Sequence, residues 1–222
     1  MRFLRSWSVP ILVVVCSCGV YAQTGAQSSS SSKKPLKRPA AEGSSALEAG
    51  SVVNGVYRNR ALSLSCKVPA GWVLRTEEMN SADDETSDQK PAPQGSTREQ
   101  RVLLATFSRP PEARGEDINS SILIAEEPVS TYPGLKDAAQ YFAPLSEVAK
   151  AQGFTVDEDP YEFAVGARNL VRGDFHKDVG TRVMRQSTLA FLSHGYVVSI
   201  TVIGGTEDEV EELVDGVSFV GK

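Results

Sequence analysis

Few residues in this chain have the chemistry of a nucleophile or a general base. Beyond residue 22 the chain has one cysteine, Cys66, and two histidines, His176 and His194. Nucleophilic catalysis needs a nucleophile, a base and a group that orients the base. A thiol-dependent or hydrolytic enzyme would therefore use Cys66 with His194 or His176, and the sequence leaves this catalytic alternative open.

The pattern around Cys66 argues against that chemistry. Apolar residues, Cys66 among them, alternate with polar residues through positions 62–68, which is typical of a strand with one buried face. A thiol on a buried face behaves as a small hydrophobe whose pKa is not lowered. His194 is predicted at a hairpin tip and His176 at a strand end, and both positions face solvent. We therefore expect no catalytic residue.

The sequence also predicts no metal site and no cofactor. Two separated histidines give little support for a zinc site. The acidic residues at positions 83–88 lack the spacing and the closing glutamate of a calcium-binding loop. Gly204 and Gly205 precede a helix start that would attract an anion, but the acids at 207–209 would repel phosphate.

The strand that carries Cys66 belongs to a stretch, residues 61–72, that organises the predicted fold. Pro69 ends the strand because proline lacks the N–H that a strand ladder needs. Gly71 allows the chain to turn, so that Trp72 folds back onto the core. This stretch therefore predicts a strand, a tight turn and a core tryptophan.

The remaining apolar patterns predict further strands and two helices. A helix is expected over residues 134–152, where Pro144 kinks or splits it and Gly153 caps it. A second helix starts at the capping box of Thr206 and Glu209. The predicted strands cover residues 101–107, 122–125, 167–175, 182–192 and 196–203. This order predicts an α+β fold, with an antiparallel sheet of roughly five to seven strands packed by helices.

The first 22 residues have the pattern of a signal peptide. Arg2 and Arg5 precede a short apolar run at positions 9–15, and small residues at 20 and 22 mark a cleavage site. The run is far shorter than the ~20 residues that span a bilayer. The chain is therefore predicted to be exported, periplasmic or extracellular. Lipid attachment at Cys18 is the alternative, and it would tether the protein to a membrane.

Composition divides the rest of the chain. Residues 23–50 are rich in Ser, Pro and Lys without any apolar period, so we expect a disordered linker. Residues 51–222 form the predicted domain. Within it, residues 77–100 are acidic and polar, which predicts a mobile insertion.

The charge of the predicted domain excludes one class of partner. Residues 51–222 hold 17 Lys and Arg against 26 Asp and Glu, a balance of −9. Binding to nucleic acid requires clustered positive charge that neutralises phosphates. The basic residues at positions 33–38 form a short run that we interpret as part of a solvated linker. We therefore expect no nucleic-acid partner.

The layout of the predicted domain resembles the PsbP-like family. The resemblance rests on the pieces Tyr57-Arg58-Asn59, Pro69-Ala70-Gly71-Trp72, 135–142, 166–203 and 206–219. It implies an α/β/α sandwich around an antiparallel sheet. It also implies a member of the bacterial cell envelope that binds or assembles other proteins, because the family lacks shared catalytic residues.

These features together predict an exported, non-catalytic binding or assembly domain of the bacterial envelope. The expected partner is another envelope protein, and contact with a membrane is expected only if Cys18 carries a lipid. A carrier of a small apolar ligand, bound between sheet and helices, is a further alternative beside the thiol-dependent enzyme.

Overall fold

The computed structural model describes residues 47–87, 100–110, 113, 115 and 117–219. The predicted signal peptide with Cys18, and the linker up to residue 46, lie outside these residues. Within the described ranges no helix is long and apolar enough to cross a bilayer.

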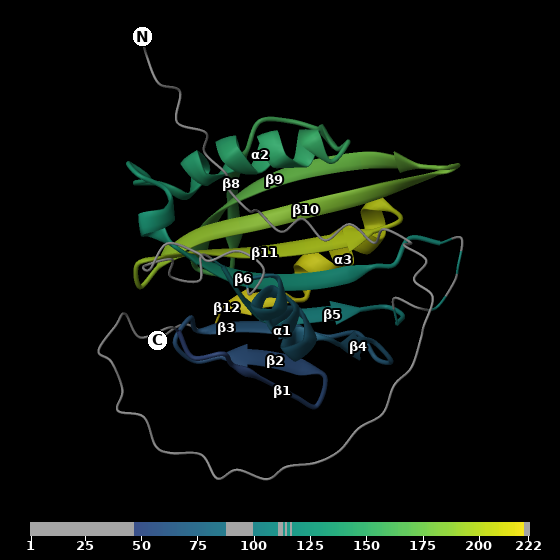
Figure 1. The fold of residues 1–222 in the computed structure, drawn as a ribbon, viewed down its shortest axis with the longest axis horizontal. Coiled ribbons are helices and arrows are strands. Elements are labelled where there is room, and N and C mark those ends of the chain that lie inside the picture. The colour runs from purple at the N-terminus through teal and green to yellow at the C-terminus, as the bar shows by residue number, and fades with distance from the viewer. Residues whose placement is uncertain (1–46, 88–99, 111–112, 114, 116, 220–222) are drawn as a thin grey trace.

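An eight-stranded antiparallel sheet forms the centre of the molecule (Figure 1). Its strand order is β4-β5-β6-β11-β10-β9-β7, and β8 also pairs with β9. The strands are β4 (Val73–Leu74), β5 (Arg101–Phe107), β6 (Ser121–Pro128), β7 (Thr155–Val156), β8 (Tyr161–Val165), β9 (Arg168–Val179), β10 (Arg182–Ser193) and β11 (Tyr196–Gly204). The strands predicted at 167–175, 182–192 and 196–203 are present as β9, β10 and β11.

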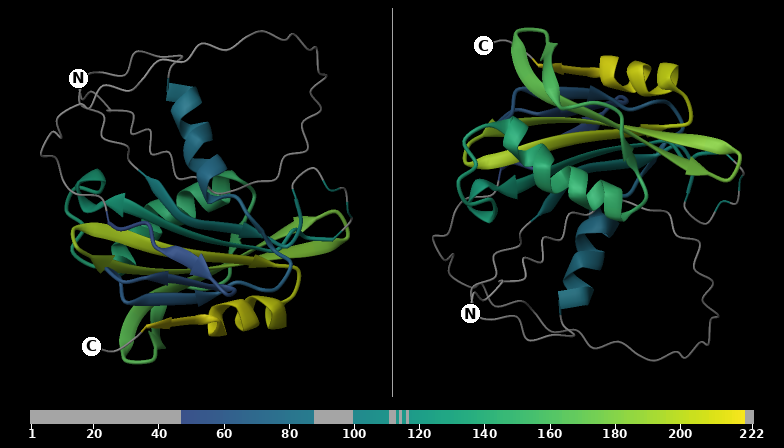
Figure 2. Two further views of the ribbon diagram at one scale, coloured as in Figure 1. Left: turned by 90° about the horizontal axis from the view of Figure 1, so that it is seen from below. Right: turned by 90° about the horizontal axis from the view of Figure 1, so that it is seen from above.

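Helices cover both faces of this sheet (Figure 2). Helices α1 (Thr76–Ser87) and α2 (Phe142–Ala151) lie on one side, and α3 (Glu207–Asp215) lies on the other. Two neighbours in β10 show the division, since Leu189 packs in the cluster with α3 and Ala190 packs in the cluster with α2. The α+β prediction, with an antiparallel sheet packed by helices, is confirmed.

A second antiparallel sheet shares the layer of α3. It contains β1 (Ser51–Val53), β2 (Val56–Asn59), β3 (Leu64–Lys67) and β12 (Val217–Phe219), in the order β1-β2-β3-β12. The predicted opening strand is β3, and it pairs with the last strand of the chain, Cys66 lying opposite Val217. The alternation at 62–68 indicated which side chains are buried but not which strands pair, so the sequence did not predict a separate sheet.

The segment predicted as a mobile insertion from residue 77 begins as helix α1. Side chains of the helix pair with the backbone of β5: Asn80 both accepts from Val102 N (3.0 Å) and donates to Val102 O (2.9 Å). The Thr76 hydroxyl accepts from Ala105 N at 2.9 Å, and Met79 packs on the same strand. These contacts order residues that lack an apolar period, and residues 88–99 lie outside the described part.

The predicted helix at 134–152 is split. A 3₁₀ turn, η2 (Ala138–Tyr141), runs into α2, and a shorter one, η1 (Val129–Thr131), follows β6. Pro144 lies in the first turn of α2, where its missing N–H costs no hydrogen bond. Gly153 follows the helix with φ +87°, as expected for a helix C-terminus.

The first described residues are held by side chains of the domain. Tyr57 donates to Ala49 O (2.9 Å), Asn59 to Glu48 O (2.6 Å), and Arg101 to Leu47 O (2.6 Å). Burial raises the pKa of Tyr57 to about 12, so it remains a donor. Residues 47–50, expected in the linker, therefore pack against the domain.

Candidate functional site

The structure places the three candidate catalytic residues in separate environments. The Cys66 side chain is 0% exposed in the core between the two sheets, and burial raises the pKa of its thiol to about 12. His176 Nδ1 contacts the Asp157 carboxylate at the edge of the eight-stranded sheet. His194 lies at the tip of the β10–β11 hairpin with φ +52°, and its ring contacts the Ser193 hydroxyl at 2.8 Å. Among the described residues no hydrogen bond joins Cys66 to either histidine.

Cys66 is expected to resist alkylation in the folded protein. The thiol is inaccessible, and a pKa near 12 leaves little thiolate at pH 8. A Cys16→Ser/Cys18→Ser variant leaves Cys66 as the one thiol. Iodoacetamide should modify Cys66 at least ~100-fold more slowly in the folded variant than in the same variant unfolded in urea, and intact-mass measurements over time give both rates. Equal rates in both states would reveal an accessible thiolate and favour the catalytic alternative.

An open cleft of about 970 Å³ lies beside Trp72. Three segments distant in the sequence line it: residues 54–56 in the β1–β2 turn, residues 67–72, and α3 with Gly216. Its apolar lining residues are Val56, Val68, Pro69, Ala70, Trp72 and Leu213. The volume is in the range typical of ligand-binding clefts.

The turn that presents Trp72 has a defined geometry. Trp72 N donates to Pro69 O at 3.3 Å, and Gly71 has φ +82°, which together describe a type II turn. Glycine suits this position because side-chain residues rarely adopt such a φ. Trp72 packs against the core cluster while it also lines the cleft, so its indole is fixed from beneath.

Backbone hydrogen bonds fix the cleft walls to one another. Val68 N donates to Gly55 O at 2.8 Å and joins the turn to the β1–β2 hairpin. Lys67 N donates to Gly216 O at 3.0 Å and joins β3 to the end of α3. The walls are therefore preformed rather than assembled by a ligand.

The wall formed by α3 is acidic. Glu209, Glu212 and Asp215 all line the cleft at intervals of three residues, whereas Lys67 is the one basic residue of the lining. The Glu209 carboxylate already accepts two hydrogen bonds within the domain, from Gly205 N (2.8 Å) and from the Ser120 hydroxyl (2.5 Å). The cleft thus combines apolar surface with negative charge.

Thr206 starts α3 as predicted. Its hydroxyl accepts a hydrogen bond from Glu209 N at 3.1 Å. The Glu209 carboxylate accepts a hydrogen bond from Gly205 N rather than from Thr206 N. The buried face of α3 consists of Val210, Leu213 and Val214.

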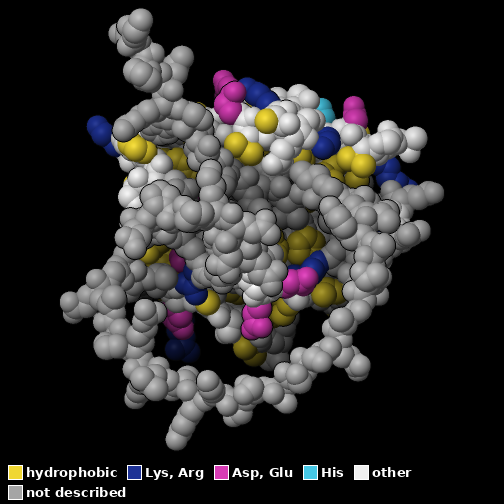
Figure 3. Space-filling view, in the orientation of Figure 1, with side chains coloured by type: hydrophobic (Ala, Val, Ile, Leu, Met, Phe, Trp, Pro, Cys, Tyr) yellow, Lys and Arg dark blue, Asp and Glu magenta, His cyan; other side chains and the backbone are white. Residues whose placement is uncertain are grey.

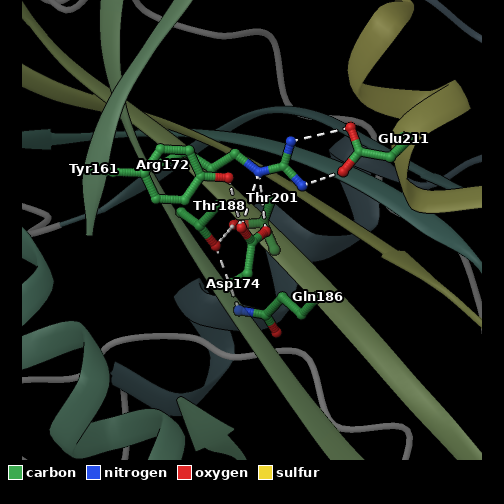
Figure 4. A network of polar contacts seen from close by, with 7 residues as sticks. All are labelled: Tyr161, Arg172, Asp174, Gln186, Thr188, Thr201 and Glu211. Atoms are coloured by element: carbon green, nitrogen blue, oxygen red, sulfur yellow. Dashed lines mark hydrogen bonds and ion pairs between the residues drawn. The ribbon is translucent and has the colours of Figure 1, made fainter. Parts of the chain in front are cut away.

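A buried arginine fixes α3 to the eight-stranded sheet (Figure 4). Arg172 of β9 makes a two-pronged ion pair with Glu211 of α3, Nη1 lying 3.0 Å from Oε2, and its Nε lies 3.0 Å from Asp174. The Tyr161 hydroxyl donates to Asp174 at 2.9 Å. Burial alone lowers the pKa of Arg172, but the hydrogen bonds to Glu211 and the charge of Asp174 raise it above its ordinary value. The guanidinium is therefore always charged and anchors the acidic wall.

Figure 4 also shows a second set of polar side chains on the neighbouring strands. The hydroxyls of Thr188 and Thr201 lie 3.1 Å apart, and the Gln186 amide donates to Thr188 at 3.4 Å. The contact between Thr188 and Thr201 joins β10 to β11, and none of these three residues lines the cleft.

Charges elsewhere on the described surface are mixed. A second hollow of about 730 Å³ contains Arg109, Arg182 and Arg185 together with acidic residues, and Arg182 is paired with Asp117 at 2.8 Å. On the face shown in Figure 3, acidic and basic side chains of the described residues are interspersed. In that part of the chain, no group of three or more His, Cys, Asp or Glu could hold a metal ion.

The sequence pointed to only some of the cleft residues. Trp72 was predicted to pack on the core, and it does, but its position in a cleft was not foreseen. Glu212 and Asp215 were not singled out. Their spacing from Glu209 is a signal that could have been used, because residues three apart share one face of a helix.

Comparisons with known proteins give likenesses of fold. No protein-family profile and no curated protein matches the chain. A protein of unknown function from Pseudomonas aeruginosa is similar in structure, with 15% identity, a TM-score of 0.37, and coverage of 59% of this chain and 89% of that one.

Two further solved structures are similar to this chain at a comparable level. LpqN of Mycobacterium tuberculosis, described as involved in cell envelope biogenesis, has 14% identity and a TM-score of 0.34, covering 71% of this chain and 83% of its own. The Ran-binding protein Mog1p of Saccharomyces cerevisiae has 12% identity and a TM-score of 0.38, covering 71% and 90%. Sequence identities of 12–15% and TM-scores below 0.4 do not support a functional assignment.

Proposed function

We propose that this chain is an exported, non-catalytic binding domain that docks onto another protein of the bacterial cell envelope. The cleft beside Trp72 carries the proposal, because it combines apolar surface, an exposed charged wall and fixed geometry. The signal-peptide pattern of residues 1–22 supports export, and the PsbP-like layout supports protein binding rather than catalysis.

The chemistry of the cleft favours a protein segment over the alternatives. A lone tryptophan supported by apolar neighbours is the kind of residue that dominates binding energy at protein interfaces. The carboxylates of α3 disfavour an apolar ligand, since burying them against hydrocarbon would leave charges without compensation. The burial of Cys66, away from both histidines, supports a non-catalytic role.

Site-specific photo-cross-linking tests the proposal. A benzophenone amino acid at Ala70, an exposed residue of the cleft, should give a reproducible adduct with one envelope protein in the cells that produce this chain. The matched control is the same group at Ala164, which is exposed on β8 outside the cleft lining. Adducts of equal yield from both positions, or none from Ala70, would overturn the proposal.

A further inference from the structure

The last turn of α3 carries charge of the wrong sign for its position. The C-terminal end of a helix has a partial negative charge, so acidic side chains there reduce helix stability. Glu212 lies in the last turn and Asp215 is the final residue, with no basic residue in that turn. The stability of the helix therefore does not explain why carboxylates occupy these two positions.

Nothing within the described residues neutralises them. Neither Glu212 nor Asp215 takes part in an ion pair there, and both side chains are exposed. By contrast, Glu211 of the same helix is paired with Arg172, which serves the fold. Glu212 and Asp215 instead line the cleft, where a ligand would meet them.

Two exposed apolar residues lie next to cleft-lining residues in the sequence. Val53 is 52% exposed and directly precedes Asn54 of the lining, while Leu74 is 50% exposed and lies two residues after Trp72. Among the described residues they are the two most exposed large hydrophobic residues, ahead of Val179. The segments that line the cleft therefore also carry exposed apolar side chains.

We infer that the cleft receives an extended segment of the partner protein in which Lys or Arg side chains alternate with apolar ones. This inference rests on the proposed function and specifies its partner. The basic side chains would pair with Glu212 and Asp215 and pass over the Trp72 ring, whose face attracts cations. The apolar side chains would pack on Val68, Leu213 and Trp72.

Selection from a random peptide library tests the inference directly, because it does not require the partner to be identified. Twelve-residue peptides displayed on phage are selected against the purified full chain, and the enriched peptides are synthesised with a fluorescent label. Enriched peptides should carry net positive charge together with apolar residues. The dissociation constant of such a peptide, measured by fluorescence polarisation, should rise with ionic strength, because salt screens exposed charges.

A charge reversal in the cleft provides the decisive comparison. Glu212→Lys/Asp215→Lys should weaken the selected peptide at least about tenfold. This variant should melt no lower than the parent, since lysine suits a helix C-terminus, so lost binding would not reflect unfolding. The matched control, Glu162→Lys/Asp178→Lys, makes the same change of net charge at exposed positions outside the cleft and should bind within about twofold of the parent.

Several outcomes would overturn the inference. These are enrichment of neutral or acidic peptides, no enrichment, or equal losses in the two double variants. The basic residues at 33–38 can also be changed to glutamine. If this change tightens peptide binding, the chain's own basic segment competes for the cleft. That segment, and not a partner protein, would then be the occupant. If Ala70 still cross-links to one envelope protein in any of these cases, the proposed function stands and only the charge rule fails.

Discussion

Replacing Arg172 with methionine is expected to lower the free energy of unfolding by about 3 kcal/mol. The Arg172 side chain is only 7% exposed, and its loss leaves Asp174, with 18% of its side chain exposed, without a cation. The expected cost lies at the low end for a broken buried ion pair because Glu211 is 46% exposed and regains water. Loss of the contact between Arg172 and the Phe163 ring, 5.1 Å away, adds to the cost.

Urea unfolding of Arg172→Met beside Arg182→Met measures this difference. Arg182 also pairs with an aspartate, but both side chains are at least half exposed, so its loss should cost under about 1 kcal/mol. The parent and both variants should unfold with the same m-value. Equal midpoints for the two variants would show that the Arg172 ion pairs do not hold α3 to the sheet.

Changing Trp72 to alanine is expected to weaken partner binding at least about 30-fold, which corresponds to about 2 kcal/mol. The indole belongs to the apolar lining and is supported by the core, as binding hot spots commonly are. Isothermal titration calorimetry with the partner captured at Ala70, or with a selected basic peptide, measures the effect.

Two variants separate binding from folding in this experiment. Trp72→Phe keeps an aromatic ring on the same support and should retain most of the affinity. Val179→Ala removes an apolar side chain of similar exposure, 41%, outside the cleft and should leave the affinity unchanged. A folded Trp72→Ala protein that binds as tightly as Val179→Ala would exclude Trp72 as a contact residue.

Local patterns in the sequence predicted the elements well. The alternation at 62–68 identified a buried strand, and Pro69 and Gly71 identified the turn that follows it. Thr206 marked the start of α3 because a capping hydroxyl acts within one helical turn. Each of these features depends on residues that are neighbours in the chain.

Features that depend on distant residues were not predicted. Helix α1 is ordered by the side chain of Asn80 pairing with Val102, and no local pattern encodes that contact. The second sheet arises because β3 pairs with β12 from the other end of the domain. The cleft likewise exists only where the β1–β2 turn, the Trp72 turn and α3 meet, so its residues could not be grouped from their sequence positions.

The nuclear magnetic resonance signal of a single fluorinated tryptophan tests the central claim most directly. The chain has two tryptophans, Trp7 and Trp72, so a Trp7→Phe protein labelled with 5-fluorotryptophan gives one ¹⁹F resonance, from the cleft. Unlabelled partner should shift this resonance in proportion to the fraction bound, and at the same partner concentration the shift should be smaller in Glu212→Lys/Asp215→Lys. A resonance that stays unchanged while calorimetry shows the partner bound would contradict the assignment of this cleft as the binding site.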